Sequence, residues 1–281
     1  MTTPPHRTTP PAGEEEVGEV FRLAEASGLG EIATHAGSVL ANGWLRVSRF
    51  REVESLMTRA LAVQVTPQSL NNAGRAGHAL GDRQTALTYF EQALPLQRAV
   101  GDRAGEAVTL NNIGAVHNAL GNRQTALTYY EQALPLQRAV GDRAGEAATL
   151  SNIGLVHHAL GDRQTALTYY EQALPLRRAV GDRAGEAVTL SNIGAVHDAL
   201  GNRQTALTYF EHALPLTRAV GDRAGEAVTR YNIAAVHAAS GDLAEAIAQM
   251  EIVVDLDRAI GHPDLAADQQ VLDQYRRRQT D

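Results

Sequence analysis

The sequence of 281 residues contains no cysteine, and its 25 basic residues are all arginine because lysine is absent as well. Without cysteine, the chain has no disulfide bond, no thiol nucleophile and no thiolate ligand for a metal ion. Without lysine, it has neither the amine of a Schiff-base enzyme nor the lysine of a phosphate-binding loop. Composition alone therefore excludes several common classes of enzyme.

Aromatic residues, positive charge and long apolar runs are also scarce. Aromatic residues make up 5% of the chain against 44% hydrophobic residues overall, which favours closely packed helices over a bulky sheet interior. The net charge of −7 argues against nucleic acid as a partner, since binding phosphates needs a basic face. No apolar run approaches the roughly 18 residues of a membrane span, and the first residues do not resemble a secretory signal. We therefore expect a cytoplasmic protein that binds no membrane and no nucleic acid.

What the sequence has instead is a period of forty residues. Glycine recurs at that step from Gly81 to Gly241, asparagine from Asn72 to Asn232, and histidine from His117 to His237. The segment GDRAGEA also recurs, beginning at residues 101–107. A fixed period of this length is typical of an array of stacked units and not of a globular enzyme with one central cleft.

Each unit is predicted to form two helices. In residues 106–120, one face at helical spacing is made by Leu110, Ile113, Gly114 and His117. Gly121 then ends this helix in a left-handed conformation, and Asn122, an aspartate in other units, caps the next helix. The second helix starts near Arg123 and buries Ala126, Leu127, Tyr130, Ala133 and Leu134.

A proline interrupts each of these second helices late in its course, at Pro95, Pro135, Pro175 and Pro215. Proline removes one backbone hydrogen bond and crowds the preceding turn. Because apolar spacing resumes after it, we expect a kinked but continuous helix. A break into two short helices is the alternative.

These residues resemble the tetratricopeptide repeat. Its pattern W-x2-L-G-x2-Y, followed by A-x3-F, is met by Leu110, Ile113, Gly114, His117, Ala126 and Tyr130, and the match recurs in register over residues 33–262. Two departures are that His117 takes the place of an aromatic residue and that Arg138 stands where a closing proline is usual. The period of forty, longer than the usual value of about thirty-four, is similar to that of kinesin light chain and spindle-orientation scaffold repeats.

The resemblance implies an all-α fold, a right-handed α-solenoid of about six helix-turn-helix units closed by a C-terminal capping helix. We expect a disordered tail at residues 1–13, an N-terminal capping helix with a degenerate repeat at 14–66, and five units of forty-residue period at 67–262. A capping helix and tail follow at 263–281. The last unit differs from the others, with Arg230 in place of leucine and Ala234 in place of glycine.

The family with these longer repeats forms a superhelix whose inner groove takes an extended peptide, and a ladder of asparagines contacts the peptide backbone. The residues here that match the ladder are Asn72, Asn112, Asn152, Asn192 and Asn232. An asparagine side chain offers both a donor and an acceptor to a peptide bond. The alternative is that each asparagine bonds only to the neighbouring helix.

The places where the copies differ point to the same groove. Units 107–146 and 147–186 differ at six positions, four of which lie in the first helix and are three or four residues apart. At about 100° per residue these positions span an arc of about 80°, away from the core face. Gln124, Thr125 and Thr128 on the second helix are expected to be exposed as well, yet they repeat unchanged. We predict a groove adapted to a ligand, with neutral drift as the alternative.

The candidate residues for peptide selectivity come from this stripe, which we call the variable stripe, in each unit. They are Asn71, Arg75 and His78; Asn111 and Asn118; Ser151, Leu155 and His158; Ser191 and Asp198; and Tyr231. The stripe changes from mildly basic at Arg75 to acidic at Asp198, which would orient a charged peptide.

The sequence predicts no catalytic site, no metal site and no cofactor. Histidines of successive units would lie about 8–10 Å apart, too far to share a metal ion. The repeated acidic residues stand at the starts of helices, where capping and the helix dipole explain them. No nucleophile elbow, zinc-protease motif or glycine-rich nucleotide loop occurs.

We therefore predict a non-catalytic adaptor that holds a peptide or a partner's tail in its concave groove. The alternative is a regulatory sensor, similar to bacterial tetratricopeptide regulators that bind signal peptides and change their pitch. Near-identical stacking surfaces would also permit a homo-oligomer.

Overall fold

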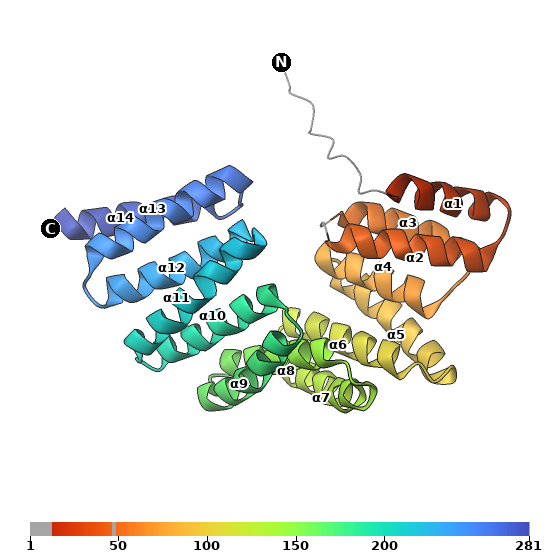
Figure 1. The fold of residues 1–281 in the computed structure, drawn as a ribbon, viewed down its shortest axis with the longest axis horizontal. Helices are drawn as coiled ribbons and strands as arrows, with labels where there is room; N and C mark the ends of the chain where they lie inside the picture. Colours follow the sequence, from red (N-terminus) through yellow and green to blue (C-terminus); the bar gives the residue numbers. More distant parts are fainter. Residues whose placement is uncertain (1–12, 47–48, 281) are drawn as a thin grey trace, which may run out of the picture. The chain divides into compact units, whose positions relative to one another are not determined.

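The computed structural model describes residues 13–46 and 49–280, and the regular secondary structure in these ranges is α-helical throughout (Figure 1). The chain divides into two compact units, Met1–Val140 and Gly141–Asp281. The first contains α1 (Glu14–Ala26), α2 (Gly30–Arg46), α3 (Phe50–Val63), α4 (Pro67–Ala79), α5 (Arg83–Ala99), α6 (Arg103–Ala119) and α7 (Arg123–Val140). The second contains α8 (Arg143–Ala159), α9 (Arg163–Ala179), α10 (Arg183–Ala199), α11 (Arg203–Val220), α12 (Arg223–Ala239), α13 (Leu243–Ile260) and α14 (Leu265–Thr280).

Within each unit, every helix packs on the next one along the chain (Figure 1). The first helix of a repeat also contacts the first helix of the following repeat: α2 with α4 and α4 with α6 in one unit, α8 with α10 and α10 with α12 in the other. This stacking of helix-turn-helix repeats confirms the predicted all-α solenoid class, and α14 is the predicted C-terminal helix. The tail expected at residues 1–13 lies, apart from Gly13, outside the described residues.

Repeated Gly-Asp or Gly-Asn pairs separate the helices. After α6, Gly121 has a φ of 80°, a left-handed conformation that strains residues with a Cβ atom. The side chain of Asp142 accepts a hydrogen bond of 2.9 Å from the backbone N–H of Gly145 and caps α8. Asp182 and Asp222 cap α10 and α12 in the same way. The chain reversals predicted at these glycines are confirmed.

Asn202 differs from the equivalent aspartates at the start of a second helix. The side chain of Asn202 makes no capping hydrogen bond within the described chain, whereas the equivalent Asp162 accepts one from the N–H of Thr165. The cap predicted at Asn122 stays a prediction, whereas Asn202, the equivalent residue two units later, makes no such bond. A neutral amide oxygen attracts the orphan N–H groups of a helix start less strongly than a carboxylate does.

Replacing Asn202 with aspartate is expected to raise the free energy of unfolding by about 0.5–1 kcal/mol, because a charged cap would form. Hydrogen bonds from Thr165 lower the pKa of the equivalent Asp162, so such a cap stabilises the fold at neutral pH and is lost as the pH falls through that lowered value. Urea unfolding near pH 7 and near pH 3, with Asn202→Ala as the control, measures the gain. An equal gain at both pH values would contradict a charged cap.

The second helices run through their prolines without a break. Pro95, Pro135 and Pro175 lie inside α5, α7 and α9, and Pro215 lies inside α11. All of these prolines are exposed. Water can therefore satisfy the carbonyl group that loses its backbone donor. The predicted continuous helix is confirmed, and the alternative of two short helices is wrong.

A glycine on each first helix gives room for an aromatic ring of the second helix. A Cβ atom built on Gly154 would lie 2.8 Å from Cε1 of Tyr170, which is fully buried. Gly74, Gly114 and Gly194 face Phe90, Tyr130 and Phe210 in the same way. In the last repeat both partners change together, since Ala234 and the buried Met250 occupy these places. Most of the predicted core positions are buried, whereas Leu134 and His117 are half-buried. The two exchanges in the last repeat fit together because one site limits the volume of the other.

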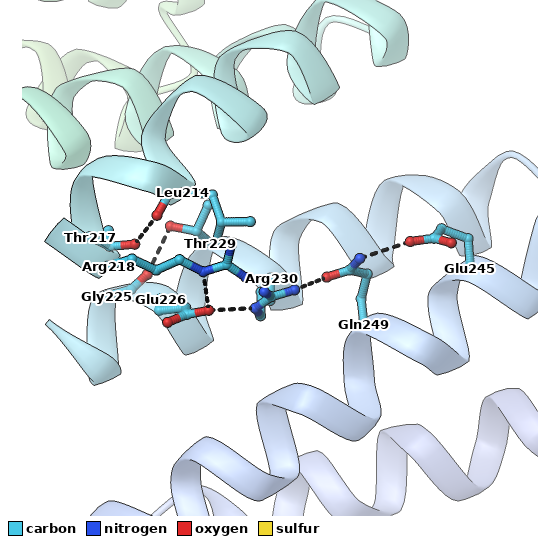
Figure 2. Close-up of polar contacts among 9 residues, drawn as sticks. All are labelled: Leu214, Thr217, Arg218, Gly225, Glu226, Thr229, Arg230, Glu245 and Gln249. Atoms are coloured by element: carbon cyan, nitrogen blue, oxygen red, sulfur yellow. Dashed lines mark hydrogen bonds and ion pairs between the residues drawn. The ribbon is translucent and has the colours of Figure 1, made fainter. Parts of the chain in front are cut away.

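The last repeat also carries a buried polar network around Arg230 (Figure 2). Arg230 is 5% exposed, its Nε donates to Oε1 of Glu226 at 2.9 Å, and its Nη1 donates to Oε1 of Gln249 at 2.6 Å. The same Glu226 oxygen accepts from Nε of Arg218 at 2.8 Å, and Gln249 donates to Glu245 at 2.8 Å. This network holds α12 on α13 at the place where the other repeats use leucine.

At the end of the second unit, α14 packs on α13. Leu272 is buried in a cluster with Met250 and Val254, and Tyr275 lies against the same cluster. None of the helices in the described ranges is long and apolar enough to cross a membrane.

Candidate functional site

The variable stripe lies on the first helix of each repeat, on α4 and α6 in the first unit and on α8, α10 and α12 in the second. Its members are exposed to different degrees. The exposed ones are Arg75, Leu155 and Tyr231. The half-buried ones are His78, Asn111, Asn118, His158, Ser191 and Asp198, and the buried ones are Asn71 and Ser151. A ligand could reach most of the stripe, but not Asn71 and Ser151.

The unchanged positions of the second helix are exposed as well. In α7 these are Gln124, Thr125, Thr128 and Glu131. The exposure predicted for them is confirmed. Solvent exposure is therefore common to the constant positions of α7 and to much of the variable stripe, and it does not explain by itself why the copies differ in the stripe.

Asn71 ties two first helices together. Its Nδ2 donates to Oγ1 of Thr109 in α6, and its Oδ1 accepts from Nδ2 of Asn112 at 3.1 Å. Both ends of the Asn71 amide are thus used inside the unit. Asn112, a residue of the asparagine ladder, uses one of its N–H donors in this contact. A hydrogen bond between a ladder asparagine and the neighbouring first helix, the alternative to peptide binding, is therefore present at Asn112.

A row of buried threonines makes the corresponding contacts in the second unit. Oγ of Ser151 lies 3.4 Å from Oγ1 of Thr189, and Oγ of Ser191 lies 3.2 Å from Oγ1 of Thr229. Thr189 and Thr229 also donate to backbone carbonyl groups one turn earlier. Sequence analysis missed this row. Its signal was a threonine at each forty-residue step from Thr109 to Thr229, directly before a core residue of the first helix.

The asparagine ladder is mostly half-buried. Asn112, Asn152, Asn192 and Asn232 keep part of the side chain accessible. Asn72 is 1% exposed, and its Nδ2 has no hydrogen-bond partner among the described residues. Four of the five ladder positions can therefore offer part of an amide to a ligand, whereas Asn72 could do so only after a rearrangement of α4.

The histidines that replace an aromatic residue stack on tyrosines of the second helix. The ring centroids are 5.5 Å apart for His117 and Tyr129, 5.6 Å for His157 and Tyr169, and 5.5 Å for His197 and Tyr209. Burial lowers the pKa of His117, and the same effect, together with a nearby arginine, lowers those of His78 and His158. Within residues 13–46 and 49–280, no three His, Asp or Glu side chains are grouped to hold a metal ion.

The first unit has a polar hollow of about 540 Å³ between α2 and α4. Thr34, His35 and Ser38 line it from α2, and Gln68 lines it from α4. Ser38 is 8% exposed, and its hydroxyl has no partner in the described part of the chain. Gln68 is the equivalent of Val108 and Ala148, which belong to the variable stripe because the two units differ there, so this hollow continues the face on which the copies differ.

The second unit has a hollow of about 290 Å³ bounded by α12, the end of α13 and the start of α14. Tyr231 lines it from α12, together with the apolar side chains of Ala227 and Val228. Asp257 lines it from α13 and Asp268 from α14, and the loop between these helices adds His262 and Asp264. The predicted selectivity residue Tyr231 is thus brought together with three carboxylates that sequence analysis did not single out.

The carboxylates of this hollow interact with each other. Burial raises the pKa of Asp268 to about 6, and a hydrogen bond with Asp257 and the charges of Asp257 and Asp264 add to the shift. Asp257 is 2% exposed, and its Oδ2 has no geometrically satisfactory hydrogen bond within the described residues. The hollow is therefore a site of concentrated negative charge.

Comparison with known proteins places this geometry in context. A family model described as tetratricopeptide repeat matches residues 65–139, 105–179, 145–219 and 185–259. These overlapping matches extend over most of the chain. No curated protein sequence matches it.

Several solved structures are similar. BtubC (BKLC) from P. vanneervenii has a TM-score of 0.61 and 26% identity, over 75% of this chain and 90% of that one. The apo form of the quorum sensor NprR from B. thuringiensis has a TM-score of 0.72 and 18% identity, over 92% of this chain and 75% of that one. NprR in complex with its cognate peptide NprX has a TM-score of 0.67 and 17% identity, over 94% of this chain and 80% of that one. The likeness to NprR shows a shared fold.

Proposed function

Because this chain belongs to the tetratricopeptide repeat family, we propose that it is a non-catalytic adaptor that binds an extended peptide or partner tail along its first helices. The family fold supports a protein-interaction scaffold, and the variable stripe supports the place of binding. The observation that carries the proposal is the contrast between two exposed surfaces. Copies of the repeat differ at stripe positions such as Leu155 and Tyr231, whereas Gln124 and Thr128 are equally accessible and repeat unchanged.

In this proposal, one set of side chains binds the peptide backbone and another set binds the peptide side chains. The half-buried asparagines of the ladder, Asn112, Asn152, Asn192 and Asn232, would hold the peptide backbone through the accessible part of their amide groups. The accessible stripe residues would select side chains of the peptide. Asn71 and Ser151 are buried and bonded within their units, so we assign them a positioning role.

The charges of the variable stripe indicate which charge of a bound peptide each unit would attract. In the first unit, the exposed Arg75 lies on α4, where its Nη1 donates to Oδ1 of Asn42 at 3.4 Å. In the second unit, Asp198 and the acidic hollow beside Tyr231 supply negative charge. A peptide with an acidic segment for the first unit and a basic segment for the second would complement both.

The alternative function is a peptide sensor. It is supported by the likeness in fold to NprR, whose structures include a complex with its cognate peptide. An adaptor and a sensor differ in whether the shape of the protein changes on binding. Small-angle scattering with saturating peptide separates them, since an unchanged profile favours the adaptor.

The proposal is tested with a random-peptide display library selected on the purified chain. Peptides recovered by the wild type should bind Asn152→Ala/Asn192→Ala at least tenfold more weakly, because two backbone contacts would be lost. The matched control is Gln164→Ala/Gln204→Ala, which truncates two exposed side chains of the second helices and should leave affinity within twofold. Circular dichroism confirms that both variants fold. Equal binding by wild type and the asparagine variant would show that the ladder does not hold the peptide.

A further inference from the structure

An aspartate occupies a buried position that carries neutral or basic side chains in the other repeats. At forty-residue steps this position holds Gln97, Gln137, Arg177, Thr217 and Asp257. Gln97, Gln137 and Thr217 are buried and uncharged, and Arg177 pairs with Asp182, the cap of the next helix. Asp257 has no such partner, because the residue five positions later is His262, whose Nδ1 accepts from the N–H of Asp264 at 3.3 Å.

A carboxylate placed there is costly in the free chain. Asp257 is 2% exposed, and its Oδ2 lacks a hydrogen bond of good geometry in the described ranges. The hydrogen bond with Asp268 is made to another carboxyl group and supplies no positive charge. Burying a carboxylate without a cationic partner costs several kcal/mol of desolvation, so neutral side chains are the stable choice, as at Gln97 and Gln137. The position opens into the hollow of the second unit. A group that enters the hollow could therefore supply the missing partner.

The remaining walls indicate which group fits. Asp264 and Asp268 add two further carboxylates, and no arginine is among the residues that line the hollow. Tyr231 presents an aromatic ring that is 36% exposed, and rings of this kind attract cations to their faces. Ala224, Ala227, Val228 and Val253 form apolar walls for a hydrocarbon stem. A planar guanidinium can bond two carboxylates at once and stack on a ring, whereas an ammonium group acts as a point charge.

We propose that the hollow formed by α12, α13 and α14 binds the guanidinium group of an arginine side chain in the partner peptide. Asp257 and Asp268 bond the guanidinium, Tyr231 covers its face, and the alanines and valines of the hollow hold its stem. This inference rests on the proposed function, because it names one side chain that the second unit selects. It is specific to the last repeat, since the equivalent of Asp257 is not acidic elsewhere.

Binding should depend on pH. Burial raises the pKa of Asp268 to about 6, with Asp257 and Asp264 beside it. Below that pH the hollow gains a proton and loses part of its attraction for a cation. His262 also faces the hollow from the loop, and Tyr231 and Tyr275 lie beside it on α12 and α14. Burial raises the pKa of the Tyr275 phenol, so this group carries no charge in this pH range.

The test uses the full chain and a single small probe, N-acetyl-arginine N-methylamide, followed by NMR shifts of Asp268 and of the Tyr231 ring. We expect saturable shifts near pH 7.5, at least tenfold weaker binding of the isosteric citrulline amide, and several-fold weaker binding of the lysine amide. Asp257→Asn should weaken arginine binding at least tenfold. The matched control is Asp255→Asn, an exposed aspartate of the same helix, which should leave it unchanged. Near pH 5 the wild type should bind several-fold more weakly.

The outcomes separate this inference from the proposed function. Equal binding of the arginine and citrulline amides, or undiminished binding by a folded Asp257→Asn variant, overturns the guanidinium site. Tyr231→Leu, which keeps an apolar wall, provides a second variant that should bind several-fold more weakly. Asn152→Ala/Asn192→Ala should bind the arginine amide as the wild type does. If that variant also keeps its affinity for the selected peptides, the proposed role of the asparagine ladder is contradicted, while the guanidinium site is still supported.

Discussion

Replacing Arg230 with alanine is expected to lower the free energy of unfolding of the chain by about 3 kcal/mol. The guanidinium is 5% exposed and bonds Glu226 and Gln249 in the interior of the last repeat. Alanine leaves the space of this long buried side chain unfilled and removes one of the two arginines that pair with Glu226, and together these effects cost about 3–5 kcal/mol. The lower end applies because Glu226 keeps its bond with Arg218. Urea unfolding followed by circular dichroism measures the loss.

The matched control is Arg230→Leu. Leu110, Leu150 and Leu190 occupy the equivalent places and are at most 2% exposed. Leucine would fill the space with apolar contacts. Glu226 would keep its ion pair with Arg218, as Glu106 keeps its pair with Arg98 in a repeat that has leucine at this place. We expect Arg230→Leu to change the free energy of unfolding by no more than about 1 kcal/mol. If alanine and leucine cost the same, the destabilisation would come from the lost charge and not from the unfilled space.

Salt provides a further check on Arg230. Buried pairs are screened much less than exposed ones, so the loss caused by Arg230→Ala should persist at about 1 M sodium chloride. A loss that disappeared in salt would contradict the burial of this pair.

Replacing Gly154 with alanine is expected to lower the free energy of unfolding by about 1–3 kcal/mol, although alanine is the better helix former. The new Cβ atom would lie 2.8 Å from Cε1 and 2.9 Å from Cδ1 of Tyr170. Tyr170 is fully buried, so its ring can move aside only by disturbing its neighbours. Calorimetric melting temperature and urea midpoint should both fall.

The chain itself suggests the compensating change. In the last repeat, alanine at the equivalent position, Ala234, faces Met250 in place of an aromatic ring. Methionine is flexible and fits irregular space. Gly154→Ala/Tyr170→Met should therefore be less destabilised than the sum of its two single variants, by at least about 1 kcal/mol in a double-mutant cycle. Strict additivity would mean that the two sites do not limit each other.

A control separates the clash from the effect of glycine on helix stability. Gly43 lies in α2, and a Cβ atom built on it would meet nothing within 4 Å. Gly43→Ala should stabilise the chain by up to about 1 kcal/mol, because alanine loses less backbone entropy in a helix. A destabilised Gly43→Ala variant would show that the cost at Gly154 is not specific to the tyrosine ring.

The sequence predicted the candidate site only in part. The variable stripe follows from positions three or four residues apart on one helix, and most of its members, including Leu155 and Tyr231, are accessible in the structure. The burial of Asn71 and Ser151 could not be predicted in that way. It depends on how closely neighbouring first helices approach and on their bonds to Thr109 and Thr189. Helical periodicity describes one helix and contains no information about the spacing between two.

The sequence by itself determined the helices of this protein, their boundaries at the Gly-Asp pairs and the core face of each repeat. These features depend on backbone conformation and on spacing within about twenty residues, and each is repeated several times along the chain. Only the tertiary structure decided where Asp257 lies. Asp257 is enclosed by α14 and by Tyr231 of α12, and this hollow exists only once the three consecutive helices α12, α13 and α14 have packed on one another.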